Sequence, residues 1–169
     1  RIEHVSVFFT EATKDVDVLI PRGSDGLMQY VRKHSLVPVI ETGAGVCHVY
    51  VEKEADIKKA VDIVVNAKVS RPSVCNAADA ILVDKPIAKD FLKELQPEFN
   101  KYNVEIFADA SAYDLLKDYS HWKKASPEDF GREFLSLKGA IKVVDNIDAA
   151  LEHISDYSTK HSEAIVSEY

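Results

Sequence analysis

Short apolar runs alternate with longer amphipathic segments along most of the chain. Runs rich in Val, Ile, Phe and Tyr predict strands, whereas apolar residues at helical spacing predict helices. The expected strands cover residues 5–9, 16–21, 37–40, 46–51, 80–83, 104–107, part of 134–144 and 161–166. The expected helices cover residues 23–33, 55–68, 86–102, 110–117 and 147–157.

The alternation of strands and helices predicts an α/β fold with a largely parallel sheet, because a helix between two strands lets the chain cross over the sheet. Residues 42–45 form a Gly-containing turn or hinge after the first elements. The stretch 118–131 is the least regular part of the chain, and we expect it to be a loop.

Composition and charge narrow the classes of function. The 169 residues carry 28 acidic and 21 basic side chains, a net charge of −7, which argues against a uniformly basic surface for nucleic acid. No apolar run reaches the ~20 residues of a membrane helix, and the start has no charged segment followed by an apolar core, so no signal peptide is expected. The first residue is Arg1, and the last residues resemble a strand, which together predict an interior piece of a longer chain.

The segment 66–78 carries the clearest candidate for chemistry. The preceding helix is expected to end near Lys68, Pro72 stiffens the loop, and residues 76–79 are expected to begin a helical turn. A thiol at Cys75 would then face backbone N–H donors, with Lys68 and Arg71 nearby in sequence, and both factors favour the thiolate. From the residues alone, a small buried apolar side chain remains the alternative interpretation of Cys75.

The other cysteine, Cys47, lies inside an alternating strand, where a structural role is expected. Two cysteines are too few for a disulfide framework. We therefore expect a reducing compartment, the cytoplasm.

Four ordered motifs resemble the γ-glutamyl phosphate reductase family of the aldehyde dehydrogenase superfamily. They read Leu-Ile-Pro-Arg-Gly-Ser-Asp-Gly-Leu at 19–27, Pro-Val-Ile-Glu-Thr-Gly-Ala-Gly-Val-Cys-His-Val-Tyr-Val at 38–51, Asn-Ala-Lys-Val-Ser-Arg-Pro-Ser-Val-Cys-Asn-Ala-Ala at 66–78 and His-Ser-Glu-Ala-Ile-Val at 161–166. Their order and their spread over most of the chain make the resemblance specific.

The resemblance implies an aldehyde-dehydrogenase-like catalytic domain at 44–169, preceded at 1–43 by a remnant of the NADP-binding domain. It implies an oxidoreductase of proline biosynthesis that reduces γ-glutamyl phosphate to glutamate 5-semialdehyde with NADPH and releases phosphate. It also implies a homo-oligomer in the full chain and an association with glutamate 5-kinase, with no metal, nucleic acid or membrane partner.

The same resemblance implies roles for single residues. Cys75 is the nucleophile that forms a thioester, and its backbone N–H is one donor to the developing oxyanion, the second lying outside this chain. Glu41 matches an acid of the superfamily and Asn76 follows the nucleophile, so both are candidate active-site residues. Glu133 matches the acid that holds the nicotinamide ribose. A solvated acid at a strand end is the alternative for Glu41.

Further candidates concern the anionic groups of cofactor and substrate. Gly23 and Ser24 lie where a helix begins and are implied to receive the cofactor pyrophosphate, although a plain helix cap is the alternative. Arg71, Lys68 and His161 are implied to bind the carboxylate and phosphate of the substrate. An ordinary surface charge is the alternative for Lys68.

Three other functions are compatible with the residues. The chain could be an inactive isolated domain of the reductase, another acylating aldehyde dehydrogenase, or a small α/β binding module with a buried cysteine. The sequence Arg-Pro-Ser-Val-Cys-Asn at 71–76 argues against the second, because general aldehyde dehydrogenases favour Gly-Gln-x-Cys before their cysteine.

Overall fold

The computed structural model describes residues 12–23, 25–41 and 43–169. The chain divides into two compact units, Arg1–Ala44 and Gly45–Tyr169, and each is described by itself. The strand expected at 5–9 lies outside the described residues.

The first unit contains a short 3₁₀ helix, η1 (Ala12–Lys14), and the helix α2 (Asp25–His34), which confirms the helix expected at 23–33. The strands expected at 16–21 and 37–40 are reduced to one parallel bridge between Leu19 and Val39. Pro21 and Pro38 lack the N–H groups that a longer ladder would need, which limits the pairing to this point.

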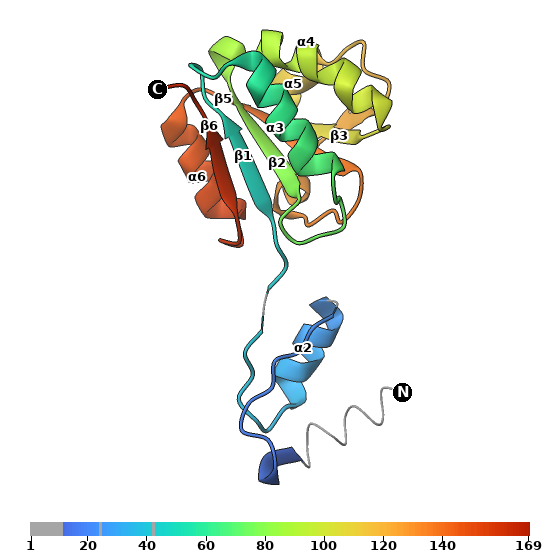
Figure 1. The fold of residues 1–169 in the computed structure, drawn as a ribbon, viewed down its shortest axis with the longest axis vertical. Helices are drawn as coiled ribbons and strands as arrows, with labels where there is room; N and C mark the ends of the chain where they lie inside the picture. The colour runs from blue at the N-terminus through green and yellow to red at the C-terminus, as the bar shows by residue number, and fades with distance from the viewer. Residues whose placement is uncertain (1–11, 24, 42) are drawn as a thin grey trace. The chain divides into compact units, whose positions relative to one another are not determined.

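The second unit is built on a six-stranded sheet in which every pair of neighbouring strands is parallel (Figure 1). The strand order is β4-β3-β5-β2-β1-β6. This arrangement confirms the predicted α/β class with a largely parallel sheet. The strands are β1 (Cys47–Val51), β2 (Ala78–Asp84), β3 (Glu105–Ala108), β4 (Trp122–Lys124), β5 (Lys138–Val144) and β6 (Glu163–Val166).

Local signals in the sequence account for where the helices of this unit begin. The side chains of Asp56, Asp109 and Asn146 each accept a backbone N–H in the first turn, and Pro86 stands at the start of the longest helix. The helices are α3 (Ile57–Val69), α4 (Lys85–Lys101), α5 (Ala110–Leu115), the 3₁₀ helix η2 (Pro127–Gly131) and α6 (Ile147–Tyr157).

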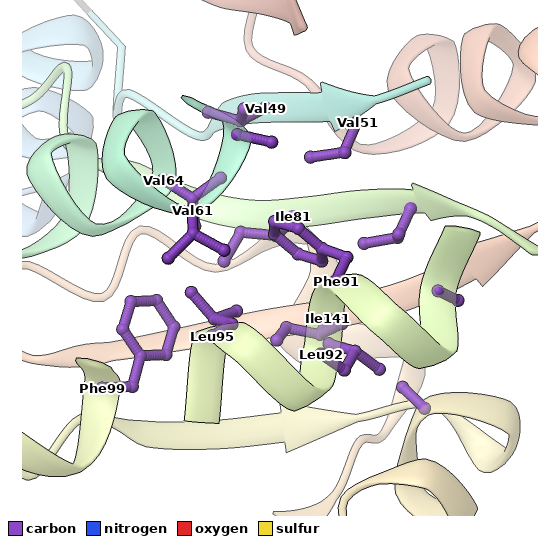
Figure 2. Packing of buried hydrophobic residues seen from close by; sticks show 14 of the residues in the cluster. Val49, Val51, Val61, Val64, Ile81, Phe91, Leu92, Leu95, Phe99 and Ile141 are labelled. Carbon is purple, nitrogen blue, oxygen red and sulfur yellow. The ribbon is translucent and has the colours of Figure 1, made fainter. Parts of the chain in front are cut away.

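Two apolar layers cover the sheet. The larger core lies between one sheet face and α3, α4 and α5, while α6 packs on the opposite face against Tyr50, Leu82 and Val144 (Figure 1). Burial on both faces explains why every residue of β1 and β2 is buried and most of them are apolar. Figure 2 shows Val61 and Val64 of α3 and Phe91, Leu92 and Leu95 of α4 gathered against Val49, Val51, Ile81 and Ile141 of the sheet.

Two details differ from the sequence prediction. The stretch 118–131 contains the short strand β4 and the helix η2 rather than a plain loop. The helical turn expected at 76–79 is wrong, because Ala78 already pairs with Cys47 in the sheet. The residues before it form turns instead, with backbone bonds from Val74 N to the Arg71 oxygen (3.2 Å) and from Ala77 N to the Val74 oxygen (3.1 Å).

Four segments that are separate in the sequence lie together at one edge of the parallel sheet. The segments that lead into β5, β2, β1 and β6 all reach the amino ends of these strands, which are neighbours in the sheet (the lower edge of the second unit in Figure 1). We call this the amino edge. Each of the four segments carries at least one of the residues discussed next.

Candidate active site

Cys75 lies on the turn segment between α3 and β2, at the amino edge, and its side chain is exposed. This exposure removes the interpretation of Cys75 as a buried apolar side chain. The segment leaves α3 after Val69 and enters β2 at Ala78, so both of its ends are held by regular structure. An exposed thiol on such a turn can attack an electrophile that approaches the edge of the sheet.

Gly45, which precedes β1, and Cys47, the first residue of β1, both contact the carbonyl oxygen of Cys75. The Sγ of Cys47 lies 3.2 Å from this oxygen as a weak donor. A Cβ atom on Gly45 would overlap the same oxygen, so the glycine permits the close approach of two backbones. Cys47 is buried, and this burial, together with the charges of Asp79 and Glu163, raises the pKa of its thiol to about 11. A structural role for Cys47 agrees with this placement.

Glu133 reaches the amino edge from the segment that precedes β5. Its Oε1 accepts the backbone N–H of Gly45 at 2.9 Å, and its side chain is half-buried. The next residue, Phe134, donates its backbone N–H to Oδ1 of Asp79 at 3.0 Å. The segment is thereby fastened to the beginnings of both β1 and β2.

His161 reaches the same edge from the segment that precedes β6 and is exposed. Its Cδ2 lies 3.1 Å from the position that a Cβ atom on Gly45 would take. The loop is held to β1 through Thr159, whose Oγ1 accepts the N–H of Val46 at 2.9 Å. Glu163 adds a second anchor, because its Oε2 accepts the N–H of His48 at 3.0 Å.

Lys68 lies inside the protein rather than on the substrate-facing surface where the sequence suggested it. Its side chain is fully buried, and Nζ donates to the carbonyl oxygen of Lys138 at 2.7 Å and lies 3.5 Å from Oδ1 of Asp79. Burial lowers the pKa of Lys68 and raises that of Asp79, and each partner opposes the shift of the other. Lys68 therefore cannot touch a substrate in this arrangement, and neither of its two sequence-based interpretations fits.

A cleft of about 330 Å³ opens beside the Cys75 segment. Arg71 and Asn76 are exposed there. A guanidinium and an amide in one cleft suit a carboxylate or phosphate group. The lining residues are Asn66, Ala67, Ser70, Arg71, Val74, Asn76 and Ala77.

The remaining candidates belong to the first unit. Gly23 is exposed just before α2, and Ser24 lies outside the described residues. Glu41 is partly buried and accepts a hydrogen bond from the guanidinium of Arg32. This bond gives Glu41 a partner within its own unit.

The structure adds site residues that the sequence analysis did not select. Asp79 holds the Phe134 amide, Thr159 and Glu163 hold the loop of His161, and Gly45 contacts Cys75. One signal was present in the sequence, since Asp79 and Asp84 are the two carboxylates of an otherwise apolar strand. The hydroxyl of Thr159 gave no such signal.

Two structural features are absent from the described residues. In this part of the chain, no three or more His, Cys, Asp or Glu side chains are grouped so as to hold a metal ion. None of the described helices is long and apolar enough to span a bilayer.

Known proteins resemble this chain in sequence and in structure. A model of the aldehyde dehydrogenase family matches residues 8–114. The chain is 53% identical over 152 residues to the Gamma-glutamyl phosphate reductase of Listeria innocua, which covers 90% of this chain and 36% of that relative. This chain therefore spans little more than a third of the length of that curated relative.

Solved structures show the same relationship. The Gamma-glutamyl phosphate reductase of Thermotoga maritima superposes with a TM-score of 0.86 at 44% identity, over 92% of this chain and 37% of that one. A propionaldehyde dehydrogenase of Clostridium phytofermentans superposes with a TM-score of 0.68 at 18% identity, over 100% of this chain and 46% of that one, and thus shares the fold. The resemblance and the fold expected from the sequence motifs are both confirmed.

Proposed function

The chain belongs to the aldehyde dehydrogenase family, and we propose that it carries the nucleophile of an enzyme that reduces γ-glutamyl phosphate to glutamate 5-semialdehyde. The name of its relatives supplies the substrate, and the exposed thiol of Cys75 at the amino edge is the observation that carries the proposal. The reaction belongs to proline biosynthesis.

The first step uses only this chain and the acyl phosphate. The Cys75 thiolate attacks the γ-carbonyl carbon, an S–C bond forms, and the C–O bond to phosphate breaks, so that phosphate leaves with the electron pair. The Cys75 backbone N–H is a candidate donor to the oxygen that becomes negative. The product of this step is a thioester on Cys75. Its later reduction breaks the S–C bond, releases the aldehyde and regenerates the thiolate.

The cofactor that this family implies is NADPH, which supplies a hydride for the reduction when it is bound. The residues in place fit such a group. Oε1 of Glu133 is engaged by Gly45, and a carboxylate retains acceptor capacity for ribose hydroxyls. Gly23 precedes a helix of ten residues, whose start is suited to a pyrophosphate. Ser24 is proposed to add a hydroxyl there.

The substrate carries a carboxylate and a phosphate, and Arg71, Asn76 and His161 are the groups proposed to receive them. Arg71 and Asn76 line one cleft, and His161 lies beside Gly45. Glu41 is proposed as an active-site acid without a general-base role, because the reaction requires no activated water. Lys68 is excluded from direct substrate contact by its burial.

The larger organisation is also part of the proposal. Residues 1–43 correspond to the end of an NADP-binding domain and residues 44–169 to the catalytic domain, and a second oxyanion donor comes from elsewhere in the full protein. We propose a cytoplasmic homo-oligomer. Association with glutamate 5-kinase would deliver the labile acyl phosphate directly.

The test uses the full-length gene product and runs the reaction in reverse, with glutamate 5-semialdehyde, phosphate and NADP, following NADPH by absorbance. We expect turnover with the wild-type protein and its loss in Cys75→Ser, whereas Cys47→Ser, the matched control for a buried thiol, keeps measurable turnover. Turnover in Cys75→Ser at the wild-type rate would show that another residue is the nucleophile. Activity only when CoA replaces phosphate would point to another acylating dehydrogenase instead.

A further inference from the structure

Lys68 and Asp79 stand on either side of the Cys75 segment. Lys68 is in the last turn of α3, and Asp79 is the second residue of β2. Both side chains are buried, with exposed fractions of 0% and 3%, and Nζ lies 3.5 Å from Oδ1. The pair therefore closes the loop whose turn presents Cys75, at the two points where that loop leaves regular structure.

Both members of this pair also hold the segment that leads into β5. Nζ of Lys68 donates to the Lys138 oxygen at 2.7 Å, and Oδ1 of Asp79 accepts the Phe134 N–H at 3.0 Å. Phe134 follows Glu133 directly in the chain. The two side chains of the ion pair thus bond to the segment that carries Glu133 at two points, Phe134 and Lys138.

A second path connects the same two segments at the surface. Glu133 accepts the N–H of Gly45 at 2.9 Å, and Gly45 lies against the carbonyl oxygen of Cys75. The Cys75 segment and the Glu133 segment are therefore connected in two ways. One connection runs through Gly45 at the surface, and the other runs through the buried pair of Lys68 and Asp79.

We propose that Lys68 and Asp79 are a positioning pair that sets the Cys75 thiol and the Glu133 carboxylate relative to one another. The catalytic consequence rests on the function proposed above. The geometric consequence, a defined placement of the thiol, stands without it.

Two properties favour positioning over a purely stabilising role. A buried ion pair is a weak source of stability, because removing two charges from water offsets most of their attraction. The bonds to Phe134 and Lys138, in contrast, are directional and can hold two backbone segments in register. A stabilising role alone requires burial and packing, whereas positioning requires the acceptor that faces Phe134.

This difference defines the variants. Lys68→Met with Asp79→Asn removes both charges but keeps an Oδ1 acceptor for the Phe134 N–H. Lys68→Met with Asp79→Leu removes the same charges and also the acceptor, at similar side-chain volume. Neither double variant leaves an unpaired buried charge. The comparison between them therefore isolates the hydrogen bond to Phe134.

The first readout is the rate at which iodoacetamide labels Cys75 in the full-length gene product, followed on the Cys75 peptide by mass spectrometry. It requires no substrate. The Leu double variant loses the bonds to both Phe134 and Lys138, and we expect its labelling rate to differ from wild type by about tenfold or more. The Asn double variant loses only the Lys138 bond, and its rate should lie between the two. The second readout is turnover, for which we expect a loss of about 100-fold in the Leu double variant and a smaller loss in the Asn double variant.

Equal labelling rates in the two folded double variants would overturn the positioning role. If either double variant fails to fold, the single variants Asp79→Asn and Asp79→Leu are compared in the same way, since both remove the carboxylate and only the first keeps an acceptor for the Phe134 N–H. Equal labelling rates in these two variants would also overturn the proposal. Absence of turnover in the wild-type protein would contradict the proposed function but leave the labelling comparison intact.

Discussion

The backbone of Gly45 lies against the carbonyl oxygen of Cys75 so closely that a Cβ atom on Gly45 would overlap this oxygen. Gly45 precedes β1 and Cys75 precedes β2, and the two strands are parallel neighbours. Gly45, within the motif at 38–51, thus determines how near the turn that carries Cys75 can come to the edge of the sheet.

Gly45→Ala should displace the Cys75 segment, because the added methyl group meets backbone atoms that cannot rotate away. We expect turnover to fall about 100-fold, the effect of a misplacement of about 1 Å, in a protein that remains folded. Gly43→Ala is the matched control, since a Cβ atom there meets nothing within 4 Å. Steady-state kinetics of the two variants make the comparison, and equal turnover in both would show that the contact is dispensable.

The two cysteines should react very differently with iodoacetamide in the folded protein. Cys75 is exposed, whereas Cys47 is buried and burial raises its pKa to about 11. At about pH 8, roughly one Cys47 thiol in a thousand would be ionised, and its burial slows labelling further. Peptide-resolved mass spectrometry should find label on Cys75 alone. Comparable labelling of Cys47 before unfolding would contradict the described packing.

Glu133 should have two separate effects. Its negative charge should favour the binding of NADPH, and its Oε1 atom should hold the backbone N–H of Gly45 in place. Glu133→Gln keeps an acceptor for the Gly45 N–H but loses the charge, and we expect the NADPH Kd to rise about tenfold. Glu133→Ala loses both, so Cys75 labelling should change as well. Fluorescence titration with NADPH measures the first effect. An unchanged Kd in both variants would remove Glu133 from the cofactor site.

Thr159 should contribute to stability through one hydroxyl group. Its Oγ1 accepts the N–H of Val46, a buried residue directly before β1. Thr159→Val keeps the shape and removes the acceptor, so the free energy of unfolding should fall by about 1–2 kcal/mol. Thr159→Ser keeps the hydroxyl and should lose less. Urea unfolding of both variants tests this, and an equal loss would assign the effect to packing.

Acid should weaken the fold through His153, which is buried among Phe130, Tyr157 and Lys142. Burial, with the charges of Lys142 and His48, lowers its pKa to about 3. The unfolded chain binds this proton near pH 6.5, so the stability due to neutral His153 is complete above about pH 6.5 and is lost as the pH falls towards about 3.

The expected slope from this one group is about 1.4 kcal/mol per pH unit across that range. His153→Gln should reduce the slope of unfolding free energy against pH. Phe130→Leu, which disturbs the same packing without a titrating group, should lower stability by a similar amount at each pH. An unchanged slope in His153→Gln would mean that other groups dominate the acid response.

Local patterns were enough to predict most elements of the second unit. The helices α3 and α6 were expected at 55–68 and 147–157 and occupy Ile57–Val69 and Ile147–Tyr157. Their capping residues and apolar spacing lie within the elements themselves, so neighbouring residues contain the necessary information. The three-residue strand β4 was not expected, because so short a strand has no periodicity of its own and forms by pairing with β3.

Lys68 shows where sequence reasoning fails at the site. A lysine beside a candidate nucleophile suggests a solvent-facing cation, because lysine is rarely buried without a partner. Its partners, Asp79 and the Lys138 oxygen, come from β2 and the start of β5. Burial depends on those distant residues, and no local pattern around Lys68 predicts it.

The motifs in the sequence were sufficient for the family and the α/β class, and they selected Cys75 as the candidate nucleophile. Only the assembled sheet decided that Cys75 is exposed, that Lys68 is internal and that Gly45, Glu133 and His161 meet at one edge. The physical reason is that helices and turns depend on neighbouring residues, whereas the amino edge exists only when β5, β2, β1 and β6 pair side by side.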